Sequence, residues 1–152
     1  MTKFSNSQDR DANYQVIGSN EAFKTVETVA FTGAAGLGAQ GTVALFTVTG
    51  AVLVSLFGVC SEDLVGATAT IEVGIAGNTA ALLAQTVATD IDSGEVWVDT
   101  APATVEGLPT SKIIGAGQDI IATVATAAIT DGTIAFYALW RPLSDDANLV
   151  AV

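Results

Sequence analysis

From residue 22 onward, hydrophobic and polar positions alternate with a period of two, the pattern of strands that bury one face. The clearest case is residues 67–77, in which Ala69, Ile71 and Val73 fall on one face and polar or small residues on the other. No amphipathic helix longer than two turns is predicted. The pattern therefore favours an all-β chain over an α/β one.

Turn residues interrupt the β-rich runs at intervals of about 8–12 residues, which is typical of an antiparallel sandwich or jelly roll. We expect about eight strands in a β-sandwich domain over 21–146, after an extended polar N-terminal arm at 1–20 and before a C-terminal tail at 147–152. Residues 79–88 fit either a strand or a short helix. The other predicted strands are 22–32, 42–49, 52–60, 67–77, 94–99, 111–115, 118–130 and 133–143.

Two short sequences predict tight turns. Gly50-Ala51 separates two β-rich runs, and glycine at the first central position suits a type II′ hairpin. Asp131-Gly132 separates two others and is a strong hairpin signal. We therefore expect each pair of runs to be neighbours in one sheet. Pro142 predicts the end of the last strand.

Composition changes the picture of the surface. The 152 residues suit one domain with a substantial core, and 50% of them are hydrophobic while only 14% are charged. A charged fraction of about a quarter is usual. The runs 42–49 and 52–60 are apolar on both faces. We therefore expect some apolar area to face another protein.

Charge limits the partners. Five basic residues oppose sixteen acidic ones, for a net charge of −11, and the basic residues are scattered. Because a nucleic-acid binder neutralises phosphates with clustered Lys and Arg, we predict no direct nucleic-acid binding. Residues 43–60 are long and apolar enough for a membrane helix, but their threonines and glycines and the lack of flanking Lys or Arg favour two strands. The N-terminus lacks the apolar core of a signal peptide, so we expect synthesis in the cytoplasm.

The residue types needed for common catalysis are missing. The sequence has no histidine, so a serine or cysteine nucleophile would lack its usual base. The single cysteine, Cys60, cannot form a disulfide within the chain, and its apolar surroundings predict a small buried side chain. A reactive or intermolecular thiol is the alternative. We predict that the protein is not an enzyme and uses no cofactor or metal.

Two motifs resemble ligand sites. Residues 36–41, GLGAQG, match the dinucleotide-binding pattern G-x-G-x-x-G, which requires a helix to follow. The following residues are β-branched, so a loop between strands is favoured over a nucleotide-binding enzyme. Residues 90–95, DIDSGE, lack the glycine and glutamate spacing of a calcium loop. A solvated acidic turn is favoured there.

Aromatic residues gather in the C-terminal half, where Trp97, Phe136, Tyr137 and Trp140 occur with Arg141. Strand periodicity predicts that Phe136 and Trp140 face the core while Tyr137 and Arg141 face outward. Because Tyr and Arg are enriched at binding hot spots, we select both as interface candidates. The alternative is an exposed stacking platform for carbohydrate, made of the two tryptophans and Tyr137.

The arm at 1–20 contributes two further interface candidates, Phe4 and Tyr14, which it could bury against a neighbouring subunit. A polar arm of this kind is either a frayed terminus or a contact laid on a neighbour.

The segments EVGIAGNTAALLAQTVATDIDSGEVWVD (72–99) and DGTIAFYALWRPLSDD (131–146) resemble small structural proteins encoded among the virion genes of tailed bacteriophages. The resemblance covers roughly residues 40–146. It implies a jelly-roll or β-sandwich module that decorates or cements a capsid, often as a trimer, or that occurs in fibres and tails. It implies a location in the virion, contacts with copies of itself and with the major capsid or another virion protein, and no catalytic residues. The alternative function is a carbohydrate- or receptor-binding module of a fibre or tail.

Overall fold

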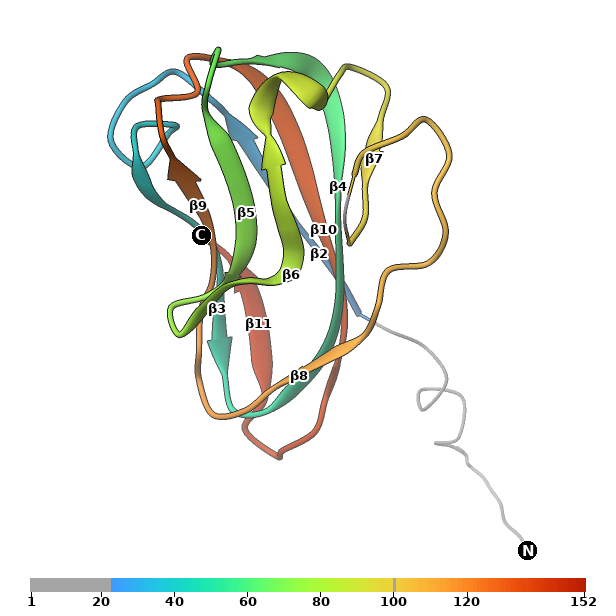
Figure 1. The fold of residues 1–152 in the computed structure, drawn as a ribbon. Coiled ribbons are helices and arrows are strands. Elements are labelled where there is room, and N and C mark those ends of the chain that lie inside the picture. The colour runs from blue at the N-terminus through green and yellow to red at the C-terminus, as the bar shows by residue number, and fades with distance from the viewer. Residues whose placement is uncertain (1–22, 100) are drawn as a thin grey trace, which may run out of the picture.

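The computed structural model describes residues 23–99 and 101–152. They form two antiparallel sheets of five strands each, packed face to face around one core (Figure 1). The predicted all-β sandwich is confirmed, with ten strands in the described residues where about eight were expected. The predicted arm at 1–20 lies outside those residues.

The first sheet, called sheet I, has the strand order β2-β10-β4-β7, and β8 also pairs with β4. Its strands are β2 (Phe23–Ala30), β10 (Asp131–Pro142), β4 (Val52–Val65), β7 (Val96–Trp97) and β8 (Lys112–Ile114). Sheet II has the order β11-β3-β9-β5-β6. Its strands are β11 (Asn148–Ala151), β3 (Gly41–Thr49), β9 (Ile120–Ala125), β5 (Thr70–Ile75) and β6 (Asn78–Val87). A 3-10 turn, Ala88–Asp90, follows β6.

The core lies between the sheets and is lined by alternate residues of each strand. Gly58 in the middle of β4 is paired with Phe136 on one side and Trp97 on the other. The two rings are 6.5 Å apart, and both are almost completely buried. A β-carbon at Gly58 would lie 3.0 Å from a methyl group of Ile134. Glycine at this position therefore makes room for the aromatic rings of the neighbouring strands.

The hairpin predicted at Gly50-Ala51 is wrong. The strand before it, β3, lies in sheet II, and the strand after it, β4, lies in sheet I. Gly50 has a φ of +64°, and a β-carbon there would lie 2.5 Å from the Ser144 hydroxyl. The Ser144 hydroxyl accepts a hydrogen bond from the Ala51 amide at 2.9 Å. The glycine thus allows a close crossing between the sheets against the turn that follows β10.

The hairpin predicted at Asp131-Gly132 is also wrong, because β9 belongs to sheet II and β10 to sheet I. Both residues are the first of β10, at a register shift against β4. Gly132 has a φ of +104°, and a β-carbon there would collide with the Asp63 carbonyl oxygen. This sequence therefore marks a β-bulge, where a glycine with positive φ is common.

The C-terminal boundary also needs correction. The segment expected as a tail, 147–152, contains strand β11, which pairs with β3. Leu149 at its centre is only 2% exposed. The sandwich therefore extends beyond 146. Residues 79–88, which fitted a strand or a helix, are mostly strand β6.

Strand β2 forms one edge of sheet I and is tied to sheet II through Thr25. The Trp140 indole donates to the Thr25 hydroxyl at 3.0 Å, and that hydroxyl donates to the Leu149 carbonyl at 3.2 Å. Two residues further along β2, Glu27 is paired with Phe136, so its side chain points toward the inside of the sandwich. An inward-pointing charge on an edge strand discourages pairing with another chain.

Glu27→Gln is expected to raise the melting temperature at pH 7. Burial raises the pKa of the Glu27 carboxyl above its ordinary value of 4.5. The folded protein therefore holds this proton more tightly than the unfolded chain, and stability is lost as pH rises through the folded pKa. The gain from Gln should disappear below about pH 4, where both side chains are neutral. Thermal melts from pH 3 to 8 measure this, and a pH-independent difference would contradict it.

Candidate interaction surface

The outer face of sheet I is apolar. Residues facing the core alternate with others that point away from it, because successive side chains of a strand lie on opposite faces. We define the apolar face as the apolar residues among these outward positions, which alternate along the strands with the outward polar residues Lys24, Thr28, Ser55, Thr133 and Arg141. Its members are Val26, Leu53, Phe57, Val59, Ile113, Ala135, Tyr137 and Leu139, all half-buried or exposed.

An aromatic pair lies at the centre of the apolar face. Tyr137 on β10 is paired with Phe57 on β4 and with Val26 on β2. The rings of Phe57 and Tyr137 are nearly parallel, with centroids 5.1 Å apart and an angle of 15° between the planes. Stacking fixes both rings before any partner arrives, so little side-chain entropy remains to be lost on contact.

Charge is distributed unevenly around this face. No carboxylate points outward from the apolar face between Leu53 and Val59 of β4 or between Ala135 and Arg141 of β10. The charged residues that do lie there are basic: Arg141 is paired with Leu53, and Lys24 with Leu139. Although the chain has sixteen acidic residues, none of them lies in these stretches of β4 and β10.

The outer face of sheet II has a different character. Threonine is frequent on it, beside the apolar residues Ala44, Ile121 and Val150, and the pairing places Thr42, Thr123 and Glu72 in one row across β3, β9 and β5. The Gln85 amide continues the row by donating to the Glu72 carboxylate at 2.9 Å. A polar outer face is ordinary for an antiparallel sheet in water. The contrast singles out sheet I as the contact side.

A prominent loop borders the apolar face. We call residues 104–110 the ridge; they lie in the connection from β7 to β8, which stands away from the sheets in Figure 1. The base of the ridge is fixed by Asp99, whose carboxylate accepts hydrogen bonds from the Thr110 hydroxyl at 2.8 Å and amide at 3.3 Å. Val105 and Leu108 are 84% and 94% exposed. Two large apolar side chains are thus held out into solvent on an anchored loop.

A hollow of about 260 Å³ separates the ridge from the sheet. It is lined by Phe57, Val96, Val98 and Leu139 on the sheet side and by 106–109 on the ridge side. The apolar face is therefore not flat. The ridge rises on the β7 side, and the hollow beneath it reaches Leu139 of β10.

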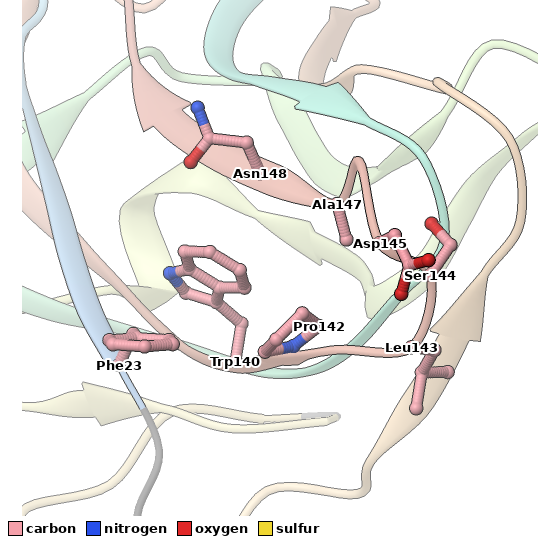
Figure 2. Close-up of a pocket in the computed structure, with 8 residues that line it drawn as sticks. All are labelled: Phe23, Trp140, Pro142, Leu143, Ser144, Asp145, Ala147 and Asn148. Atoms are coloured by element: carbon pink, nitrogen blue, oxygen red, sulfur yellow. The ribbon is translucent and has the colours of Figure 1, made fainter. Parts of the chain in front are cut away.

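A second hollow, of about 690 Å³, opens at the end of the sandwich where β10 turns into β11. Figure 2 shows the Trp140 indole between Phe23 and Pro142 on one side of it. The Ser144 hydroxyl in its wall donates to the Asp146 carboxylate at 2.7 Å and accepts from the Ala51 amide. Its hydrogen bonds therefore hold the turn.

The structure brings together two of the four predicted interface residues. Tyr137 and Arg141 both point outward from β10, as the periodicity predicted, while Phe4 and Tyr14 lie outside the described residues. Sequence reasoning missed Leu108 and Ile113. The signal available for the first was an apolar residue next to Pro109 in a long connection, which strand periodicity does not detect.

The predicted core positions of Phe136 and Trp140 are confirmed, and Trp97 is buried as well, so the residues of the carbohydrate platform do not share an exposed surface. Trp97 and Trp140 are 1% and 7% exposed, and Phe136 is fully buried. The edge of Trp140 is used for its bond to Thr25. Only Tyr137 of the three proposed stacking residues has an exposed side, so these residues offer no shared surface to a sugar.

Cys60 is buried, as its apolar surroundings predicted, with 2% of its surface exposed. Burial raises the pKa of the thiol, and the nearby carboxylates of Asp63, Asp92 and Glu95 raise it further, against a lowering contribution from the Glu62 backbone. The thiol donates to the Glu62 carbonyl at 3.2 Å. A buried, protonated thiol is a poor nucleophile.

The glycine-rich motif at 36–41 is a loop between β2 and β3, as favoured from the sequence. No helix follows it, since β3 begins at Gly41. Gly38 has a φ of +116°, and a β-carbon there would collide with the Ile129 carbonyl oxygen. The Ile129 amide in turn donates to the Gly38 carbonyl at 2.8 Å. Glycine at position 38 thus allows the backbone of this loop to contact the backbone at Ile129.

Acidic residues collect at the end of β4, around the turn that was compared with a calcium loop. Asp63 accepts from the Ser93 amide at 2.7 Å, and Glu95 accepts from the Asp92 amide at 3.2 Å. Across the described part of the chain, no group of three or more Cys, Asp or Glu residues is arranged to hold a metal ion.

Within 23–99 and 101–152, no helix has the length and apolar character needed to cross a membrane. Comparison with family models, curated proteins and solved structures finds no match to this chain.

Proposed function

We propose that this protein is a non-enzymatic structural component of a tailed-phage virion, decorating or cementing the capsid, and that it packs against other protein through the apolar face. The observation that carries the packing role is the contrast between the two outer faces. One carries several threonines and Glu72, while the other has a stacked aromatic pair, large aliphatic side chains and no acidic residue between Leu53 and Val59 of β4 or between Ala135 and Arg141 of β10. Exposed apolar patches with a polar surround are typical of protein interfaces.

The sequence resemblance supplies the virion setting, and it falls on the relevant strand. The segment 131–146 covers β10 and the turn after it, so it includes Tyr137, Leu139 and Arg141 of the outer face. The net charge of −11 repels packaged nucleic acid, which favours a position on the protein shell. Many weak contacts repeated over a symmetric shell stabilise it by mass action.

Ile113→Asp is expected to release the protein from phage particles. Ile113 is 71% exposed on β8 beside Leu53, so the change costs little folding energy but places a charge within the contact. We expect at least about a tenfold fall in copies per particle, because a buried unpaired charge strongly opposes association. Gradient-purified particles of the phage that encodes the chain, grown with each variant, are analysed by quantitative mass spectrometry.

Val150→Asp is the matched control. Val150 is 45% exposed on β11, on the outer face of sheet II, and this variant should bind particles like the native protein. The proposal is overturned if the native protein is absent from purified particles, or if the two variants are lost equally.

A further inference from the structure

The shape of the apolar face limits what can cover it. The ridge raises the side next to β4 and β7, and the hollow beneath it reaches Leu139 of β10, whereas no residue of β2 lines that hollow. A flat partner would touch the ridge and leave the low β2 side open. A partner with complementary shape has a recess opposite the ridge and a projection opposite the β2 side.

A second copy of the same chain meets that condition. Rotation by 180° about an axis parallel to the strands, lying in the contact plane, places the β7 side of each copy over the β2 side of the other. Each ridge then occupies the low half of the opposite face, and both contacts are equivalent, as a two-fold interface requires. Val105 and Leu108 of one copy come to lie over the region of Val26 and Tyr137 of the other.

Charge agrees with the same arrangement. Copies with a net charge of −11 repel one another in most orientations. The apolar face has no acidic residue between Leu53 and Val59 of β4, and its low half carries Lys24 next to Leu139. The acid on the ridge is Glu106, which is exposed between Val105 and Leu108. The rotation places Glu106 of each copy on the side where the other presents Lys24.

The area approaches that of a standard stable interface. Strands rise about 3.4 Å per residue and lie about 4.8 Å apart, so the twelve residues of β10 with its neighbours span roughly 40 Å by 15–19 Å. This is on the order of 600–750 Å² in projection, before the ridge is added. A standard stable interface buries about 800 Å² on each partner.

We propose that two copies of this chain pair through their apolar faces, with the ridge of each seated on the β10–β2 half of the other and Glu106 opposite Lys24. The pairing rests on the proposed function and specifies it: the protein that packs against the apolar face is a second copy, and Ile113→Asp releases the chain from particles by breaking the pair.

Sedimentation velocity of the full chain, from about 1 µM to 1 mM, tests the pairing. The native protein should show a concentration-dependent dimer. Leu108→Asp should weaken it at least about 100-fold, as expected for a central apolar anchor, while Val150→Asp should leave it unchanged. Leu108 and Val150 are both exposed, so neither change is expected to prevent folding.

A charge swap makes the test specific for orientation. Glu106→Lys and Lys24→Glu should each weaken the dimer about tenfold, and the double variant should recover to within about threefold of the native affinity. Asp145→Lys, an equal change of charge on an exposed turn, should have no such effect. Failure of the double variant to recover overturns the proposed orientation.

Other occupants give different results. A monomer at all concentrations overturns the pairing, whether residues 1–22 or a different protein covers the face. A dimer that persists in Leu108→Asp also overturns it. If the protein is a monomer but Ile113→Asp is lost from particles, the pairing is wrong and the proposed function stands. If the protein is a two-fold dimer but is absent from particles, the pairing stands and the proposed function is wrong.

Discussion

Phe136→Ala is expected to lower the free energy of unfolding by about 3–5 kcal/mol, the range for removing a fully buried ring. Phe136 is at the centre of sheet I, paired with Gly58 and close to Trp97. Gly58 has no side chain with which to fill the space, so the cavity will collapse poorly. Chemical denaturation monitored by tryptophan fluorescence measures the loss. Phe136→Leu, expected to cost about 1–2 kcal/mol, keeps the measurement possible if the alanine variant does not fold.

The neighbouring residue provides the control. Tyr137 is an aromatic residue of similar size, one position along the same strand, but it points to the apolar face and stacks on Phe57. Tyr137→Ala should cost only about 1 kcal/mol, since a half-exposed stacked pair contributes about that much. Equal costs for the two alanine variants would contradict the assignment of the two sides of β10.

Gly38→Ala is expected to cost about 3 kcal/mol. Alanine pays roughly 1–2 kcal/mol for a positive φ, and here its β-carbon would also collide with the Ile129 carbonyl oxygen. The strained loop must move, which breaks the hydrogen bond from the Ile129 amide. Urea denaturation of the variant gives the value.

Gly36→Ala separates strain from collision. Gly36 belongs to the same loop and has a φ of +77°, but nothing lies within 4 Å of a β-carbon built there. Gly36→Ala should therefore lower the free energy of unfolding only by the cost of a positive φ for alanine, about 1 kcal/mol. If Gly36→Ala and Gly38→Ala were equally destabilising, backbone contact would not be the reason for glycine at position 38.

Most strands could be predicted from the sequence because their alternation is local. At and just before β5, Ala69, Ile71 and Val73 are predicted to share one face, and all three are fully buried. The pairing of the strands could not be predicted in this way. Gly50 and Asp131-Gly132 have the chemistry of tight turns, yet a glycine with positive φ serves equally at a crossing between sheets and at a bulge. Which one forms depends on partners distant in the chain.

The contact surface was predictable only in part. Periodicity placed Tyr137 and Arg141 outward on β10, but it could not show that Phe57 lies beside Tyr137, because that pairing joins residues eighty positions apart. The ridge was harder still. No periodic pattern surrounds the exposed Leu108. The position of the ridge depends on the hydrogen bonds from Thr110 to the Asp99 carboxylate.

The position of β10 between β2 and β4 has a consequence for biosynthesis. The ribosome delivers β4 long before Asp131, the first residue of β10, is made. At about 5–20 residues per second, the interval is on the order of several seconds. During that time the most apolar strand of the nascent chain lacks its central neighbour, so holdase chaperones should be most needed on chains halted before residue 131.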